Sequence, residues 1–186
     1  MPETRVIAGR FRGRRLRLPG GAVRPTQQRV REALFALLGP LEGRRVLDLF
    51  AGSGALAIEA LSRGAASAVL VERDARALTT IKANLRSLQL RPPLAVVRAA
   101  DARRYLASRQ GREDAPFDVV FCDPPYDSAS QLAATIDRRL APLLAEDAVI
   151  VTESHRHAPL ELGFEPIRQR RYGDTLISLY RASGRA

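Results

Sequence analysis

Several residue types are scarce in this sequence, and each scarcity removes a class of protein or site. Cys122 is the single cysteine, and His155 and His157 are the only histidines. A disulfide framework is therefore excluded, and a structural zinc site fits poorly. No apolar run reaches the ~18 residues of a membrane span, and no signal peptide is evident. We expect a cytoplasmic protein with no metal site and no membrane partner.

Lysine is almost absent too, although the chain is strongly basic. Lys82 is the only lysine among 30 basic residues, and the net charge is +10. Arginine makes bidentate contacts to phosphate and stacks on bases, so this charge favours a nucleic-acid partner. A GC-rich genome would explain arginine in place of lysine, but not the excess of base over acid.

The 186 residues are expected to form one α/β domain at 24–186, preceded by a basic hairpin arm at 1–23. Six arginines lie among short apolar positions in residues 5–18, RVIAGRFRGRRLRL. We predict a pair of short strands there that contacts phosphate. The alternative is a solvated, partly disordered tail.

Residues 24–40 (RPTQQRVREALFALLGP) are predicted to form a helix, with Thr26 as a candidate N-cap. Arg24, Arg29 and Arg31 lie near its start, where positive charge opposes the helix dipole. We therefore expect these arginines on the polar side of the helix, in contact with an anion.

The central motif is Val46–Leu61, VLDLFAGSGALAIEAL, which reads as a buried strand, a glycine turn and the start of a helix. Gly52 and Gly54 allow a tight turn and close approach of a ligand. The following helix would direct its free N–H groups at that ligand. Asp48 interrupts the apolar strand, and its carboxylate needs a partner there.

Further apolar strands alternate with helices along the chain, and residues 109–116 are predicted to be a loop. The later strands are expected at residues 68–71, 94–97, 117–122 and 148–151, with two more around the Gly173–Asp174 turn. This alternation predicts a parallel sheet covered on both faces, with antiparallel strands at one edge.

Acidic residues follow several of these strands. Glu72 comes about 20 residues after the glycine turn, where an acid binds ribose in nucleotide-binding folds. Asp101 follows the third strand, although it could simply cap the next helix. Asp123-Pro124-Pro125-Tyr126 follows the fourth. The glycine turn and Glu72 alone would also suit a nicotinamide-dependent dehydrogenase.

Together these motifs resemble the class I S-adenosylmethionine-dependent methyltransferases. The resemblance implies a Rossmann-like, mostly parallel sheet of seven strands with helices on both faces. In that class the glycine turn lies beside the cofactor, the acid after strand two binds ribose, and the acid after strand three meets the adenine amino group. The cofactor-binding residues implied here are Asp48, Phe50, Ala51, Gly52, Gly54, Glu72, Arg73, Asp101, Ala102 and Asp123.

The tetrapeptide DPPY is typical of enzymes that methylate a conjugated nitrogen, so its four residues are the catalytic candidates. An exocyclic amino group is a poor nucleophile, because its lone pair is delocalised into the ring. The Asp123 carboxylate and the Pro124 carbonyl can accept hydrogen bonds from the two N–H groups of the amine, which favours a pyramidal nitrogen. Pro125 holds Pro124 extended, and Tyr126 can stack on the base.

The order of motifs over residues 5–181 resembles one family in particular, the bacterial 16S rRNA guanine-N2 methyltransferases. The matching segments are RVIAGRFRGRRL, RPTQQRVREALF, LDLFAGSGALAIEALSRGA, DPPY and YGDT. The resemblance implies methylation of N2 of guanine 966 (customary rRNA numbering) in an assembled or assembling small subunit. The substrate-binding residues it implies are Arg5, Arg10, Arg12, Arg14, Arg24, Thr26, Arg29 and Tyr126. Gln28 stands where the family usually has an acid, so any contact of that carboxylate is lost or replaced.

Other interpretations remain open at this point. DPPY would equally suit adenine-N6 methylation of DNA or RNA, and a non-catalytic RNA-binding ribosome-assembly factor could keep such a fold. Glu153 and the Tyr172–Thr175 turn either line the substrate cleft or merely end strands. A monomer is the simplest expectation.

Overall fold

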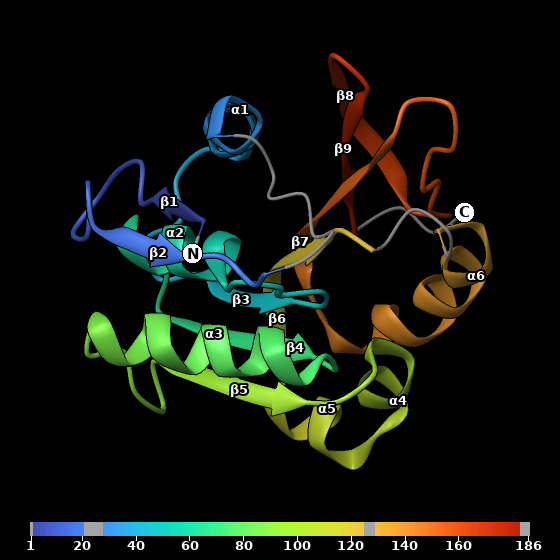
Figure 1. The fold of residues 1–186 in the computed structure, drawn as a ribbon. Coiled ribbons are helices and arrows are strands. Elements are labelled where there is room, and N and C mark those ends of the chain that lie inside the picture. The colour runs from blue at the N-terminus through green and yellow to red at the C-terminus, as the bar shows by residue number, and fades with distance from the viewer. Residues whose placement is uncertain (1, 21–27, 125–128, 183–186) are drawn as a thin grey trace.

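The computed structural model describes residues 2–20, 28–124 and 129–182. A seven-stranded sheet with the order β5-β4-β3-β6-β7-β9-β8 runs through the molecule (Figure 1). Its strands are β3 (Arg45–Asp48), β4 (Ser67–Glu72), β5 (Ala95–Ala99), β6 (Phe117–Cys122), β7 (Leu144–His155), β8 (Glu165–Tyr172) and β9 (Thr175–Arg181). Strands β3 to β7 are parallel, whereas β9 runs antiparallel to β7 and β8. The predicted Rossmann-like sheet with an antiparallel edge is confirmed.

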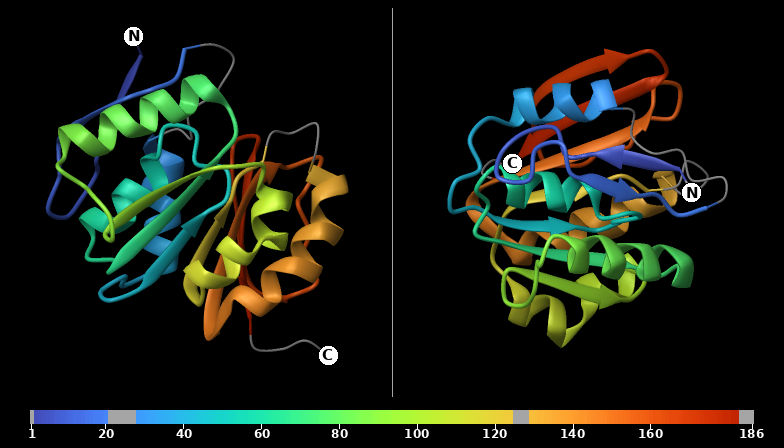
Figure 2. Two further views of the ribbon diagram at one scale, coloured as in Figure 1. Left: turned by 90° about the horizontal axis from the view of Figure 1, so that it is seen from below. Right: turned by 60° about the vertical axis from the view of Figure 1, so that its left-hand side comes forward.

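Helices cover both faces of this sheet. One core cluster joins the sheet to α1 (Gln28–Leu38), α2 (Ala55–Ser62) and α3 (Ala75–Ser87), and a second joins it to α4 (Ala102–Ala107) and α6 (Ala129–Leu140). In the right-hand view of Figure 2, α1 and the β8–β9 hairpin lie at the top and α4 lies at the bottom. A 3-10 helix, η2 (Ala141–Leu143), leads into β7. Each helix within the described ranges is too short or too polar to span a bilayer.

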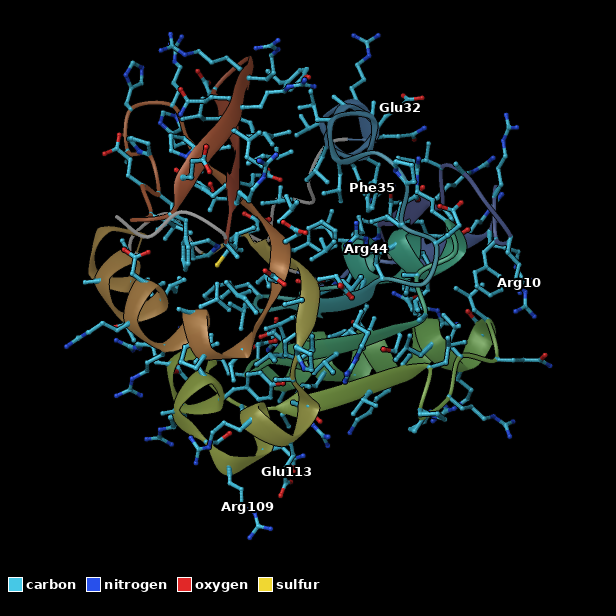
Figure 3. The ribbon with its side chains drawn as sticks, turned by 180° about the vertical axis from the view of Figure 1, so that it is seen from behind. Arg10, Glu32, Phe35, Arg44, Arg109 and Glu113 are labelled. Carbon is cyan, nitrogen blue, oxygen red and sulfur yellow. The ribbon has the colours of Figure 1, made fainter. Side chains whose placement is uncertain are left out.

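Helix α1 packs its apolar side on the sheet at the strand that precedes DPPY. The Phe35 ring meets the Phe121 ring of β6 edge to face, with the centroids 5.7 Å apart. Figure 3 shows Phe35 pointing from α1 toward the sheet, whereas Glu32 points away from it. The C-terminal half of α1, which carries Phe35, therefore lies over the face of β6 to which Phe121 belongs.

The prediction of a loop at residues 109–116 was wrong, because most of this segment forms α5 (Arg109–Asp114). The sequence of α5 has no apolar periodicity that would predict a helix. Polar contacts stabilise this helix instead. Ser108 caps its first turn through Oγ. At its end, the Asp114 carboxylate accepts a 2.6 Å hydrogen bond from Arg98 of β5.

The N-terminal arm forms the predicted pair of antiparallel strands, β1 (Glu3–Arg5) and β2 (Arg15–Arg17). Its apolar side chains Val6 and Leu16 are buried in the same core cluster as α1 and α2. The arm is thus packed against the α/β core. The predicted boundary near residue 24 falls outside the described residues and stays a prediction.

Candidate functional site

The predicted cofactor residues converge on one edge of the sheet. β3, β4, β5 and β6 are parallel neighbours, so their carboxyl ends lie together. The glycine turn follows β3, Glu72 ends β4, Asp101 follows β5, and Asp123 follows β6. A ligand at this edge would have residues from four strands within reach.

The glycine turn has the conformation that its sequence predicts. Gly52 and Gly54 have φ angles of 54° and 79°, in the left-handed region that favours glycine. A Cβ on Gly54 would lie 3.0 Å from the Leu70 side chain, so the turn packs closely on β4 there. A Cβ on Gly52 would meet nothing closer than the Phe50 carbonyl oxygen at 4.0 Å. The side of the turn at Gly52 is therefore open to a ligand.

Asp48 is only partly hydrogen-bonded in its buried position, because its Oδ2 has no partner among the residues that the structure describes. Its carboxylate accepts hydrogen bonds from the N–H groups of Ala57 and Phe50, and only 1% of the residue is exposed. Burial raises the pKa of Asp48 to about 7, with a further contribution from the negative charge of Glu72. Ala57 lies in the first turn of α2, so this carboxylate uses an N–H group that we expected to face the ligand. Asp48 therefore lies inside the turn, and its contact with a cofactor stays a prediction.

Glu72 joins the end of β4 to the glycine turn. Its Oε2 accepts a 2.8 Å hydrogen bond from the Gly52 N–H group. Its Oε1 accepts from the N–H groups of Arg73 at 2.7 Å and Asp74 at 2.8 Å. A carboxylate has about four acceptor positions, so one remains on the Oε2 side that faces the turn. This geometry suits a ribose hydroxyl beside Gly52.

Asp101 is a helix cap, which was the alternative open from the sequence. Its Oδ1 accepts hydrogen bonds from the N–H groups of Arg103 at 3.0 Å and Arg104 at 3.4 Å. Its Oδ2 lies 3.4 Å from the Arg73 guanidinium. Burial would raise the pKa of Asp101, but these N–H bonds and the neighbouring arginines lower it overall. Asp101 is thus an ionised acceptor at the outer edge of the site.

A cavity of about 740 Å³ opens beside Asp101. It is lined by Arg73, Ala99, Ala100, Asp101, Arg103, Arg104 and Arg139. Ala102 is buried behind this rim, whereas the Arg73 side chain is 68% exposed. The cavity has the position expected for the adenine end of a nucleotide-like cofactor.

The DPPY segment begins where β6 ends. Asp123 is partly buried and Pro124 is buried, directly after the buried Cys122. Burial, with the negative charge of Asp123 close by, raises the pKa of the Cys122 thiol, so a thiolate nucleophile is disfavoured. Pro125 and Tyr126 lie outside the described residues.

The arm arginines and Arg29 have exposed side chains, as an RNA-binding role requires. The exposed residues are Arg5, Arg10, Arg12, Arg14 and Arg29. The Arg10 guanidinium lies 5.2 Å from the Phe11 ring centroid, and Arg14 donates to the Ser87 carbonyl at 2.9 Å. Arg24 and Thr26 lie outside the described residues.

The prediction that Arg31 faces an anion was wrong. Only 1% of Arg31 is exposed, and its Nη2 donates to the Arg5 carbonyl at 2.6 Å and to Thr4 Oγ1 at 3.1 Å. Burial lowers the pKa of Arg31, whereas the charge of Glu59 raises it. The sequence misled because Arg31 lies next to the apolar stripe of α1, and its long side chain reaches the arm backbone.

Sequence reasoning missed the residues that hold the arm on α2. The Glu59 carboxylate accepts hydrogen bonds from the N–H groups of Ile7 at 2.7 Å and Ala8 at 3.0 Å. Ser62 Oγ accepts from the Phe11 N–H group at 2.9 Å and donates to the Ala8 carbonyl at 2.5 Å. The available signal was one acid in the otherwise apolar helix ALAIEALS.

Asn84 of α3 was also missed, and it links the arm to the glycine turn. Its Nδ2 donates to the carbonyl oxygens of Arg17 at 3.0 Å and Ser53 at 2.9 Å. Its Oδ1 accepts from the Arg17 N–H group at 2.9 Å. Asn84 is buried, so these contacts satisfy a polar side chain in the core.

The comparisons with known proteins show the family of this chain. The sequence pattern of the family described as conserved hypothetical protein 95 matches residues 4–181. YlbH of Bacillus subtilis, which is named provisionally as an rRNA methyltransferase, is 40% identical over 187 residues that cover 97% of this chain and all of YlbH. Ribosomal RNA small subunit methyltransferase D of Haemophilus influenzae is 37% identical, with 85% of this chain and 82% of that protein covered.

Solved structures share the fold of this chain. The Thermus thermophilus protein TTHA0928 has a TM-score of 0.79 and 33% identity, over 95% of this chain and 98% of that one. An RNA methyltransferase from Salinibacter ruber, solved with S-adenosyl-L-homocysteine, has a TM-score of 0.65, with 86% of this chain and 94% of that one covered. Because its identity is 17%, this second likeness concerns the fold alone.

Proposed function

The chain belongs to the conserved hypothetical protein 95 family, and from this membership we propose that it methylates the exocyclic N2 of a guanine in 16S rRNA. It is an rRNA methyltransferase that depends on S-adenosylmethionine. One observation carries the amino-group chemistry of this proposal, whereas the choice of guanine over adenine rests on the resemblance of the motifs to the guanine-N2 methyltransferases. Asp123 and Pro124 follow β6, and β6 pairs with β3, which leads into the open glycine turn.

The residues around the turn fit S-adenosylmethionine, which supplies an electrophilic methyl group when bound. The open side of Gly52 admits a ligand against the backbone, and the remaining acceptor position of Glu72 suits a ribose hydroxyl. The ionised Asp101 carboxylate suits the adenine amino group at the rim of the cavity. These residues bind and orient the cofactor.

Asp123 and Pro124 act on the target nitrogen. The Asp123 carboxylate and the Pro124 carbonyl accept hydrogen bonds from the two N2–H groups. These bonds favour a pyramidal nitrogen, whose lone pair is no longer conjugated with the ring. The N2 lone pair would bond to the methyl carbon as the bond from that carbon to the sulfonium sulfur breaks, with its electron pair left on the sulfur. N2 would then carry a positive charge and release a proton. The Asp123 carboxylate, which accepts a hydrogen bond from N2, would take that proton, and no covalent nucleophile is needed.

The arm and the start of α1 supply the RNA contacts. Arg5, Arg10, Arg12 and Arg29 present exposed guanidinium groups, which suit the phosphates of a folded RNA. Arg24, Thr26 and Tyr126 complete the proposed substrate contacts. The natural substrate is 16S rRNA within a small subunit or an assembly intermediate.

Methyl transfer in vitro tests this proposal. Unmethylated small subunits and naked 16S rRNA are incubated with the protein and labelled S-adenosylmethionine, and the nucleosides are identified by mass spectrometry. We expect N2-methylguanosine, formed faster on subunits than on naked rRNA. N6-methyladenosine would support adenine-N6 methylation, and no product with either substrate would support a non-catalytic assembly factor.

Calorimetry separates the proposal from the dehydrogenase interpretation. We expect binding of S-adenosylmethionine and of its demethylated product, and no measurable binding of NAD. Tight binding of NAD alone would contradict the assignment of the glycine turn to a methyl donor.

A further inference from the structure

Strand β7 places a second carboxylate beside Asp123. Cys122 of β6 pairs with Thr152 of β7, so the following residues, Asp123 and Glu153, lie at the same level. Neighbouring strands lie about 4.8 Å apart, which brings the two backbones side by side at the carboxyl edge of the sheet. The site therefore continues from β6 onto β7.

Glu153 belongs to the face of the sheet that α1 covers. Side chains alternate along a strand, and Val149 and Val151 lie in the core cluster of α1 and α2. Glu153 continues that alternation, and Phe121 of β6, two residues before Asp123, lies in the same core cluster and touches Phe35 of α1. Glu153 therefore lies on the face of the sheet that α1 covers, one strand away from Asp123.

Glu153 is largely shielded from solvent. Only 7% of the residue is exposed, and its register partner on β9 is the fully buried Ile177. A carboxylate in such a place forms stronger hydrogen bonds than one in water. It also has about four acceptor positions, so it can accept another hydrogen bond beside its contacts within the fold.

We propose that Glu153 reads the N1–H group of the target guanine and so makes the site specific for guanine over other bases that carry an amino group. This inference rests on the proposed N2 methylation. When Asp123 and Pro124 accept hydrogen bonds from the two N2–H groups, N1–H is the next donor along the same edge of the base. An acceptor one strand from Asp123 has the right chemistry and position to bind it.

Other bases fail this test in different ways. Adenine has an unprotonated N1, whose lone pair would face the Glu153 carboxylate and be repelled. The base 2-aminopurine keeps the 2-amino group that Asp123 requires, but its N1 also lacks a proton. It therefore isolates recognition at N1 from the chemistry at N2, apart from the O6 that it also lacks.

The first experiment uses the unaltered protein and two RNA substrates, with guanine or 2-aminopurine at the target position. We expect methyl transfer to 2-aminopurine to be at least about tenfold slower than to guanine, which is what a hydrogen bond to a charged group contributes. Equal rates on the two substrates would overturn the role of Glu153. No transfer to guanine would instead contradict the proposed function itself.

The second experiment compares Glu153→Gln with the unaltered protein on the same two RNAs. The glutamine amide can accept from guanine N1–H or donate to the N1 of 2-aminopurine, so we expect the preference for guanine to fall about tenfold or more. The ratio of the two rates cancels the effect of O6, because both proteins meet the same missing atom. An unchanged ratio in a folded Glu153→Gln variant would overturn the inference.

Glu146→Gln is the matched control. Glu146 lies in the same strand, exposed and at the opposite end from the site. We expect its preference between the two RNAs to equal that of the unaltered protein. Thermal unfolding and binding of S-adenosylmethionine are measured for both variants, and if Glu153→Gln does not fold, the first experiment decides alone.

Discussion

The two ends of α2 serve two different regions of the molecule. Its N-terminal end follows the glycine turn, where Asp48 and Glu72 accept hydrogen bonds from backbone N–H groups. Its C-terminal half carries Glu59 and Ser62, which hold the arm. At the first end the contacts shape an open ligand site, whereas at the second they bury the joint between two segments. Changes at one end should therefore leave the task of the other end largely intact.

The arm also divides its own groups between two tasks. Its backbone is held, because the Ile7 and Ala8 N–H groups donate to Glu59 and the Arg10 N–H group donates to the Ser62 carbonyl at 2.7 Å. A Cβ on Gly9 would lie 1.8 Å from that same carbonyl oxygen, so only glycine fits between arm and helix. The arginine side chains are left exposed. A fixed backbone with exposed guanidinium groups suits RNA whose shape is already set.

The largest effect is expected at the arm joint, from Glu59→Ala. The carboxylate is 1% exposed, and its loss leaves the N–H groups of Ile7 and Ala8 and the Arg63 guanidinium without this acceptor. It also removes the negative charge that acts on the buried Arg31. We expect the free energy of unfolding to fall by about 3–5 kcal/mol, as when one partner of a buried pair is removed. Chemical denaturation measures this loss.

The exposed Glu32 of α1 provides the control for that variant. Glu32→Ala should change the free energy of unfolding by no more than about 0.5 kcal/mol. If Glu59→Ala is as stable as Glu32→Ala, the arm is not held by this carboxylate and the contrast between the ends of α2 fails.

In the ligand site at the N-terminal end of α2, Asp123→Ala should lower kcat strongly without weakening the binding of the cofactor. Losing one positioned acceptor costs about 10²–10³-fold in turnover. We expect this loss in kcat on 16S rRNA, with little change in the Kd of S-adenosylmethionine by calorimetry. Asp147→Ala, an exposed acid before the core of β7, should keep the original kcat. Turnover by Asp123→Ala at the original rate would refute the proposed role.

Asp48 makes the glycine turn sensitive to pH. Its pKa in the folded protein is raised to about 7, so between about pH 4 and pH 7 the folded state holds a proton that the unfolded state has lost. The free energy of unfolding should therefore fall as pH rises through this window, by at most about 1.4 kcal/mol per unit. Asp48→Asn should flatten this slope in urea titrations.

The range between about pH 4 and pH 7 distinguishes Asp48 from the other acids whose pKa values are shifted. Hydrogen bonds from Arg98 and Tyr105 outweigh burial and lower the pKa of Asp114, and the pKa of Asp101 is lowered too. Their contributions to stability are present above about pH 4 and are lost only below it. An Asp48→Asn variant that keeps the full slope between pH 4 and pH 7 would contradict the assignment.

The smallest effect is expected from a single exposed arginine of the arm. Arg12→Ala should weaken RNA binding modestly and lower the salt dependence of log Kd by about 0.7–0.9, the value of one phosphate contact. Arg109→Ala is the control, because Arg109 lies in α5, far from Arg10 of the arm in Figure 3. Equal salt dependence in the two variants would remove Arg12 from the RNA contacts.

The sequence predicted the strands, the glycine turn and the acids at strand ends, because each depends on local patterns. Apolar runs mark strands, Gly52 and Gly54 mark positive φ angles, and DPPY is a contiguous motif. The arm joint could not be predicted in this way. Glu59 meets Ile7 from 52 positions away, and no local pattern encodes that contact.

The predictions for Arg31 and for residues 109–116 were wrong for related reasons. Arg31 reads as a surface residue from its type, and only the approach of the arm backbone buries it. α5 has no apolar stripe and depends on contacts with β5 that form in the folded chain. The direction of Glu153 could likewise not be decided until its register beside β6 was known.

The most direct test of the proposed activity is the modification of 16S rRNA in cells that lack this protein. Small subunits are isolated from a deletion strain and from the same strain supplied with the unaltered protein or with Asp123→Ala. We expect one N2-methylguanosine to be missing from 16S rRNA in the deletion strain, restored by the unaltered protein and not by the variant. Unchanged N2-methylguanosine in the deletion strain would contradict the proposed methylation of guanine N2.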